Sequence, residues 1–173
     1  MKRGSKKAVS EVIASVLLIL VVIAAAGVIY GFVMPLIKTN IEESQKCSSA
    51  VLEIDTESGY TCYDPYENEV SVEIKRSEKD VEITGIQLQV YSAGKSTSAT
   101  IRNGTVVDGI REYSQTAYGK NLTIPKKNEA NTYVIDLSKI GTPETVAVAS
   151  LIKIGNTEKL CGASTKVAIN TCA

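Results

Sequence analysis

The sequence contains no histidine and no tryptophan, and only one phenylalanine, among 173 residues. Histidine is the commonest general base in enzymes and the commonest metal ligand, so its absence removes the usual component of both kinds of site. The chain also lacks an excess of charge, because 19 Lys and Arg residues balance 19 Asp and Glu residues. This excludes a nucleic-acid binder that relies on bulk positive charge. No Ser/His/Asp set, Cys/His pair, P-loop or GxGxxG motif is present, and we expect neither enzymatic activity nor a cofactor.

What the sequence has in excess is one long apolar segment near its N-terminus. Residues 12–37 hold 22 apolar side chains in 26 positions and no charged one, whereas the whole chain is 44% apolar. As an α-helix the segment would be about 39 Å long, which exceeds the roughly 30 Å hydrocarbon core of a bilayer. Buried core helices are rarely this long and apolar on every side. We therefore predict a membrane-resident helix.

The charges around this segment predict its orientation. Residues 1–8 carry four basic side chains and no acidic one, and only Lys38 follows closely behind the apolar run. By the positive-inside rule the N-terminus lies in the cytoplasm and the polar remainder is exported. A cleaved secretory signal peptide is the main competitor, but its apolar region spans only about 7–15 residues and ends in small residues. Here the run is longer, and its alanines 24–26 lie in its middle.

Four residues in or beside the apolar run are candidates for helix packing. Gly27 and Gly31 form a GxxxG pattern, which lets helix backbones approach closely in lipid, although Gly and Ala are also common in membrane helices generally. Pro35 should bend the helix or loosen its last turn, because it has no N–H to donate. Glu11 lies at the border of the run. It either complements the helix N-terminus behind Ser10, which physics alone favours, or pairs with a positive charge of a neighbouring chain.

Beyond residue 50 the apolar pattern changes to the alternation that is typical of β-strands. Turn-forming pairs such as Asn103-Gly104 and Asp108-Gly109 separate the segments. Seven to nine short strands at this spacing predict a β-sandwich or barrel, for which an immunoglobulin-like arrangement is favoured. The expected fold class is therefore α+β, a long apolar helix followed by an all-β domain. The predicted strands are 51–55, 70–75, 81–83, 86–91, 98–102, 121–124, 132–137, 146–154 and 165–169.

The four cysteines, Cys47, Cys62, Cys161 and Cys172, all lie in the part predicted to be exported. Disulfides are the favoured interpretation there, and each would stabilise the domain by about 2–4 kcal/mol. Four cysteines permit three connectivities. We favour Cys47–Cys62 with Cys161–Cys172, because each pair brackets one hairpin-sized segment. Zinc is the alternative, but neither a CxxC spacing nor a histidine occurs, so no metal site is predicted.

Two further features of the β part are candidates for surface roles. Asn103 and Asn121 each begin an N-x-T pattern and are N-glycosylation candidates, although short patterns of this kind often arise by chance.

A tyrosine cluster around Cys62 could be a subunit contact or an adhesive surface, since Tyr is favoured at interfaces, but such clusters more often pack beside a disulfide. Carboxylates in the same region could bind calcium, but no EF-hand spacing supports this and a solvated loop is the simpler interpretation. The tyrosines are Tyr60, Tyr63 and Tyr66, and the carboxylates are Asp64, Glu67 and Glu69.

The segment SKKAVSEVIASVLLILVVIAAAGVIYGFV resembles the N-terminal segment of archaeal type IV pilins and their flagellin-like relatives. Proteins of that family have a short basic class III signal peptide, a V-S-x-V-I start and a long apolar helix. The resemblance covers about a fifth of the chain. It implies that a membrane-embedded prepilin peptidase cuts on the cytoplasmic side, before the apolar run. The helix is then retained and becomes the filament core.

The resemblance places the cut between Ala8 and Val9, with Lys7 and Ala8 as the basic and small residues before it. Cuts after Lys7 or after Gly4 remain open. Many relatives carry Pro where this chain has Glu11, and in bacterial type IV pilins the family Glu is the fifth mature residue, whereas Glu11 would be the third. Glu11 thus departs from the family position that pairs with the new amine, although it keeps a carboxylate near the new N-terminus. Cleavage after Ala8 would remove four basic residues and leave 15 basic against 19 acidic side chains, a balance of −4.

The implied organisation is a leader peptide (1–8), a membrane and filament-core helix (9–46) and an extracellular β-sandwich domain (47–173). The implied function is that of a structural subunit of a surface filament for adhesion or cell contact. Its partners would be further copies of itself, the prepilin peptidase, an assembly ATPase and a membrane platform. An archaellin of the swimming filament is the first alternative, although archaellin starts usually read G-x-G-T-x-I. A single-pass membrane-anchored binding module, which keeps its N-terminus and stays monomeric, is the alternative from another class.

Overall fold

The structure is a computed structural model that describes residues 5–163 and 166–172, with side chains described from Ile13 onward. The chain divides into two compact units, Met1–Ser44 and Gln45–Ala173. The first unit is helical and the second contains ten β-strands among the described residues. The coarse prediction of an α+β chain, one long apolar helix followed by antiparallel sheets, is confirmed.

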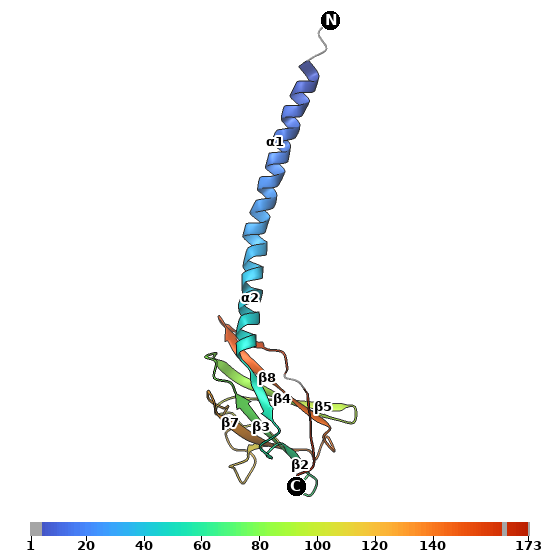
Figure 1. The fold of residues 1–173 in the computed structure, drawn as a ribbon, viewed down its shortest axis with the longest axis vertical. Helices are drawn as coiled ribbons and strands as arrows, with labels where there is room; N and C mark the ends of the chain where they lie inside the picture. Colours follow the sequence, from blue (N-terminus) through green and yellow to red (C-terminus); the bar gives the residue numbers. More distant parts are fainter. Residues whose placement is uncertain (1–4, 164–165, 173) are drawn as a thin grey trace. The chain divides into compact units, whose positions relative to one another are not determined.

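Three consecutive helical segments form the N-terminal part of the chain (Figure 1): α1 (Ser5–Val28), the π-helix η1 (Ile29–Val33) and α2 (Met34–Ser49). The π-helix ends two residues before Pro35, which has no N–H to donate to the carbonyl of Gly31 four residues earlier. The turn widens there, and the Met34 N–H donates to the carbonyl of Ile29 instead. Pro35 is then accommodated in the first turn of α2, where its missing N–H costs little.

The second unit contains two antiparallel sheets of five strands each. In sheet A the order is β1-β3-β7-β6, with β2 also paired to β3, and in sheet B it is β10-β8-β4-β5, with β9 also paired to β8. The strands of sheet A are β1 (Leu52–Asp55), β2 (Cys62–Asp64), β3 (Glu69–Arg76), β6 (Ile110–Glu112) and β7 (Ala130–Asp136). Those of sheet B are β4 (Ile83–Ser92), β5 (Lys95–Ile101), β8 (Thr145–Ile154), β9 (Thr157–Leu160) and β10 (Val167–Ala168).

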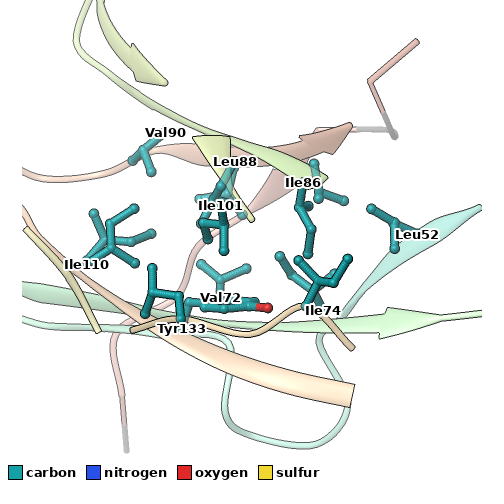
Figure 2. Packing of buried hydrophobic residues seen from close by; sticks show 14 of the residues in the cluster. Leu52, Val72, Ile74, Ile86, Leu88, Val90, Ile101, Ile110 and Tyr133 are labelled. Carbon is teal, nitrogen blue, oxygen red and sulfur yellow. The ribbon is translucent and has the colours of Figure 1, made fainter. Parts of the chain in front are cut away.

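One apolar core lies between the two sheets (Figure 2). Alternate residues of β3 point inward, and Val72 and Ile74 are fully buried there. They face Ile86 and Leu88 of β4 across the core, so one strand of each sheet supplies its centre. Tyr133 of β7 is also fully buried, and its hydroxyl donates to the carbonyl of Thr123 at 2.6 Å. Burial raises the pKa of this phenol, because the charged form would lose its hydration.

Most predicted strands are present, and the departures have local causes. Of the predicted strand 81–83 only Ile83 is in a strand, β4, which also contains the predicted segment 86–91 and whose register shifts between Ile83 and Gly85. The predicted strand 121–124 is wrong, because this segment makes only an isolated bridge through Leu122 to Thr105. Leu122 is nevertheless completely buried, which explains its apolar, strand-like pattern. The short strands β2, β6 and β9 were not predicted, since runs of three or four residues carry little periodicity.

The predicted disulfide pairing is also wrong. The bonds are Cys47–Cys161 and Cys62–Cys172, and they join residues 114 and 110 positions apart. Cys172 is brought to Cys62 by a parallel bridge in which the Tyr63 N–H donates to Asn170 and the Cys172 N–H donates to Tyr63, both at 2.8 Å. Tertiary pairing of the C-terminal segment with β2, rather than closeness in the sequence, decides the connectivity.

Candidate functional site

The largest candidate site in the first unit is the apolar surface of the helix. The described chain has one helix that is long and apolar enough to cross a membrane, Ile13–Ser49, with a mean hydropathy of 2.9 in its most apolar window. Every large apolar side chain from Ile13 to Ile37 is at least 40% exposed, and none of that window is buried by the rest of the chain. We call these side chains the apolar helix surface. Such a surface is not stable in water and needs lipid or another apolar partner.

The two glycines of the GxxxG pattern lie on this helix, one on either side of the junction between α1 and η1. A Cβ atom built on Gly27 or Gly31 would meet no atom within 4 Å. Glycine in a helix interior costs about 1 kcal/mol relative to alanine, so each glycine destabilises the isolated helix. Packing within the described chain therefore does not require either residue to be glycine.

The residues predicted to take part in cleavage fall at the edge of the described region. The backbone of Lys7, Ala8, Val9 and Glu11 belongs to α1, but their side chains lie outside the described residues, as does Gly4 altogether. Pro35 is the second residue of α2, and Thr39 Oγ1 donates to its carbonyl at 3.0 Å.

The apolar helix together with the two disulfides indicates an N-terminal membrane anchor or signal sequence on an extracellular protein.

A second candidate site is a pocket of about 460 Å³ on the outer face of sheet A. Ser71 of β3 and Val134 of β7 face each other in the sheet and belong to its lining. The disulfide Cys62–Cys172 also lines it. Tyr60 contributes an aromatic ring from the loop before β2.

The aromatic partner of Tyr60 is Tyr113, which directly follows β6. The two rings meet edge to face, with centroids 5.5 Å apart and planes at 71°. About half of each residue is exposed, 48% for Tyr60 and 57% for Tyr113. Of the three tyrosines named from the sequence, Tyr60 alone belongs to this pair in the described structure, because the hydroxyl of Tyr63 donates to Asn68 Oδ1 and Tyr66 is 96% exposed.

Charged groups from two strands, Glu69 of β3 and Arg111 of β6, also line the pocket. Arg111 Nη2 donates to Glu69 Oε2 at 2.9 Å, and the Tyr118 hydroxyl donates to Glu69 Oε1 at 2.5 Å. The guanidinium of Arg111 also lies 5.5 Å from the centroid of the Tyr118 ring. Burial raises the pKa of the Tyr118 phenol, and the negative charge of Glu69 raises it further.

The three carboxylates named from the sequence, those of Asp64, Glu67 and Glu69, all line this pocket. Asp64 Oδ1 accepts the N–H groups of Tyr66 and Glu67, at 2.8 and 3.3 Å, and so closes the turn after β2. Within the described ranges, no group of three or more His, Cys, Asp or Glu residues could hold a metal ion.

The structure brings the two glycosylation candidates to neighbouring segments. Thr105, two residues after Asn103, bridges Leu122, which follows Asn121 directly. Asn103 Oδ1 accepts the N–H of Ile124 at 2.7 Å, so this amide holds the end of the 121–124 segment. The side chain of Asn121 makes no such bond among the described residues.

Compared with models of known protein families, the sequence matches none. A search of curated proteins likewise finds no similar sequence.

Proposed function

We propose that this protein is a structural subunit of an archaeal type IV pilus-like surface filament that serves adhesion or contact with surfaces and cells. The apolar helix would reside in the membrane before assembly and in the filament core afterwards. The two-sheet domain would form the outer layer, and we propose an immunoglobulin-like arrangement for it. The observation that carries the proposal is the apolar helix surface, combined with the basic tip and VSEVI start that precede it.

The apolar helix surface must be kept out of water. Burying one large aliphatic side chain is worth about 1.5–3 kcal/mol, so exposing the whole surface to water would cost far more than a domain's net stability. Lipid and a bundle of like helices both remove that cost. A helix that is apolar on every side can therefore pass from one environment to the other, as a filament subunit must.

Gly27 and Gly31 provide a place where a second helix can pack closely. Lipid offers no hydrophobic drive for helix association, so packing depends on close backbone approach at small residues. Since Gly27 and Gly31 have open space beside their Cα atoms, a second helix could approach there. They destabilise the isolated helix, and close packing in an assembled bundle would offset this loss of stability.

The first test is the intact mass of the protein co-expressed with an archaeal prepilin peptidase. The proposal expects loss of residues 1–8 and retention of the apolar segment, with the new N-terminus at Val9. A cut after Gly4 or Lys7 would move the bond but keep the proposal. An uncut chain, or a cut beyond residue 37, contradicts it.

The second test is electron microscopy of surface filaments with variants of the helix. Gly27→Leu should abolish or strongly reduce filaments while the membrane level of the protein stays normal. Val28→Leu adds bulk one residue away and should leave assembly intact. A normal number of filaments in the Gly27→Leu strain would show that filament assembly does not depend on this glycine.

These experiments, together with a swimming assay of the strain that lacks the protein, also separate the proposal from its rivals. A membrane-anchored binding module keeps its N-terminus and forms no filament. An archaellin forms a filament whose loss abolishes swimming rather than adhesion.

A further inference from the structure

The pocket on the outer face of sheet A has a chemistry of its own. We call it the tyrosine–carboxylate pocket and define it by Tyr60, Tyr113, Asp64, Glu67 and Glu69. Its volume of about 460 Å³ falls in the range of small-molecule and side-chain binding sites. It belongs to the second unit alone, so it exists whether or not the chain forms a filament.

The charge of the pocket is negative. Three carboxylates line it against one cation, Arg111. That cation is already neutralised by Glu69 at 2.9 Å, and its other terminal nitrogen donates to the carbonyl of Gln115 at 2.8 Å. An incoming anion would therefore meet a guanidinium whose charge is already compensated, together with two carboxylates that repel it.

Two carboxylates remain able to accept hydrogen bonds from a ligand. The carboxylate of Glu67 has no partner among the described residues, and Asp64 uses only Oδ1 in its turn. These oxygens lie on the same pocket as the tyrosine pair. They suit a ligand that donates several hydrogen bonds and carries positive charge.

The tyrosines add the second component of cation recognition. The face of a phenol ring carries negative potential and attracts an ammonium or guanidinium group within about 6 Å of its centroid. About half of Tyr60 and of Tyr113 is exposed, so ring surface is available beside the edge-to-face contact. The rings would also cover the alkyl part of a long basic side chain.

We propose that the tyrosine–carboxylate pocket binds an organic cation, an alkylammonium or guanidinium group such as the end of a lysine or arginine side chain. Glu67 and Asp64 accept its N–H groups, and Tyr60 and Tyr113 hold its alkyl stem and share its charge. Because the pocket is open to solvent, binding of a single side chain should be weak, with a dissociation constant in the millimolar range.

The test is a titration of the full-length protein in a non-ionic detergent, which itself presents no cation. N-acetyl-lysine methylamide is the probe, and N-acetyl-norleucine methylamide is its uncharged counterpart. The lysine probe should give saturable NMR shifts at the amides of residues 60 and 113 that weaken with added salt. Equal shifts with the norleucine probe, or none with lysine, would overturn the proposal.

Matched variants locate the binding. Glu67→Gln should raise the dissociation constant at least about threefold, whereas Glu78→Gln, an exposed glutamate outside the pocket lining, should leave it unchanged. Tyr113→Leu should weaken binding and the exposed Tyr66→Leu should not. Should Tyr113→Leu fail to fold, Glu67→Gln decides, because no described residue depends on that carboxylate. An unchanged affinity in Glu67→Gln contradicts the proposal.

Two sources of the cation, a neighbouring copy of the chain and another molecule, are distinguished by carbodiimide coupling in a mixture of isotopically light and heavy chains. A link from Glu67 of one copy to a lysine of another identifies a neighbouring subunit as the donor. Probe binding without such a link identifies a basic group on another molecule. Both results support the pocket as a cation site.

Discussion

The crossed disulfides predict an unusual result when pairs of cysteines are replaced by alanine. Cys47–Cys161 and Cys62–Cys172 span overlapping stretches of chain, so each bond shortens the loop that the other closes. Removing one bond should therefore lower the free energy of unfolding by less than its sequence separation suggests. Removing both bonds should lower it by more than the sum of the two single losses.

The magnitudes follow from the chain-entropy description of a cross-link. A bond that closes a loop of 110 residues by itself stabilises the fold by about 4.8 kcal/mol. When Cys47–Cys161 is intact, the shortest path from Cys62 to Cys172 runs 15 residues back to Cys47, across the bond, and 11 residues on from Cys161. This loop of about 26 residues corresponds to about 3.5 kcal/mol.

Three alanine variants separate the possibilities. Cys62→Ala/Cys172→Ala breaks one bond and should lower the free energy of unfolding by about 3.5 kcal/mol, and Cys47→Ala/Cys161→Ala by the same amount. Cys47→Ala/Cys62→Ala carries the same number of substitutions but breaks both bonds. It should lose about 8 kcal/mol, which leaves a domain of ordinary stability close to unfolded.

The assay is denaturant unfolding of the full chain in mild detergent, with the remaining thiols alkylated. Near-UV circular dichroism is a suitable signal, because seven of the eight tyrosines lie beyond residue 44 and Tyr133 is fully buried. If Cys47→Ala/Cys62→Ala loses no more stability than Cys62→Ala/Cys172→Ala, the crossed connectivity is refuted. A smaller loss in Cys47→Ala/Cys62→Ala would mean that Cys47 and Cys62 are bonded to each other, and an equal loss that Cys47 is bonded to Cys172.

Four further predictions concern single residues. Ile74→Ala should destabilise the second unit by about 2–5 kcal/mol in denaturant unfolding, because the fully buried side chain leaves a cavity. Asn103→Ala should cost about 1–3 kcal/mol, since it leaves a largely buried N–H without its acceptor, whereas Asn121→Ala should change stability by less than about 0.5 kcal/mol in the same assay. The carboxylate of Asp55 accepts hydrogen bonds from two backbone N–H groups, which lower its pKa below 3.8. The charged carboxylate therefore stabilises the fold above that pH, and this stabilisation is lost as the pH falls through the lowered pKa. Asp55→Asn should lack this acid-dependent part of the unfolding profile. Leu18→Lys should impair membrane insertion by about 3 kcal/mol, measured as the fraction of chains resistant to alkaline extraction.

The sequence predicted the helix well because its signal is local. Residues 12–37 are apolar at almost every position, so no partner has to be known to recognise a segment that avoids water. Even the disturbance at Pro35 follows from a missing N–H within one turn, and a π-helix lies there. The strands β3 and β8 were found for a related reason, since alternation or a continuous apolar run reports burial directly.

The errors arise where burial and strand pairing separate. Leu122 is as buried as any strand residue, yet its segment makes only one bridge, so an apolar pattern reports burial and not hydrogen bonding. The tyrosine–carboxylate pocket shows the same limit. Its carboxylates are close in the sequence, so the sequence alone groups them. Tyr113 follows β6, and nothing in the sequence around it indicates a contact with Tyr60.

The sequence by itself therefore determined the division into an apolar helix and a β-rich part, because composition and periodicity act over a few residues. It also determined that the cysteines lie outside the apolar segment and have no histidine as a co-ligand. Only the tertiary structure decided which cysteines bond, because Cys172 meets Cys62 through strand pairing across 110 residues. Only the tertiary structure formed the pocket, because it joins loop residues, four strands of sheet A and the C-terminal segment, whose contacts no local pattern specifies.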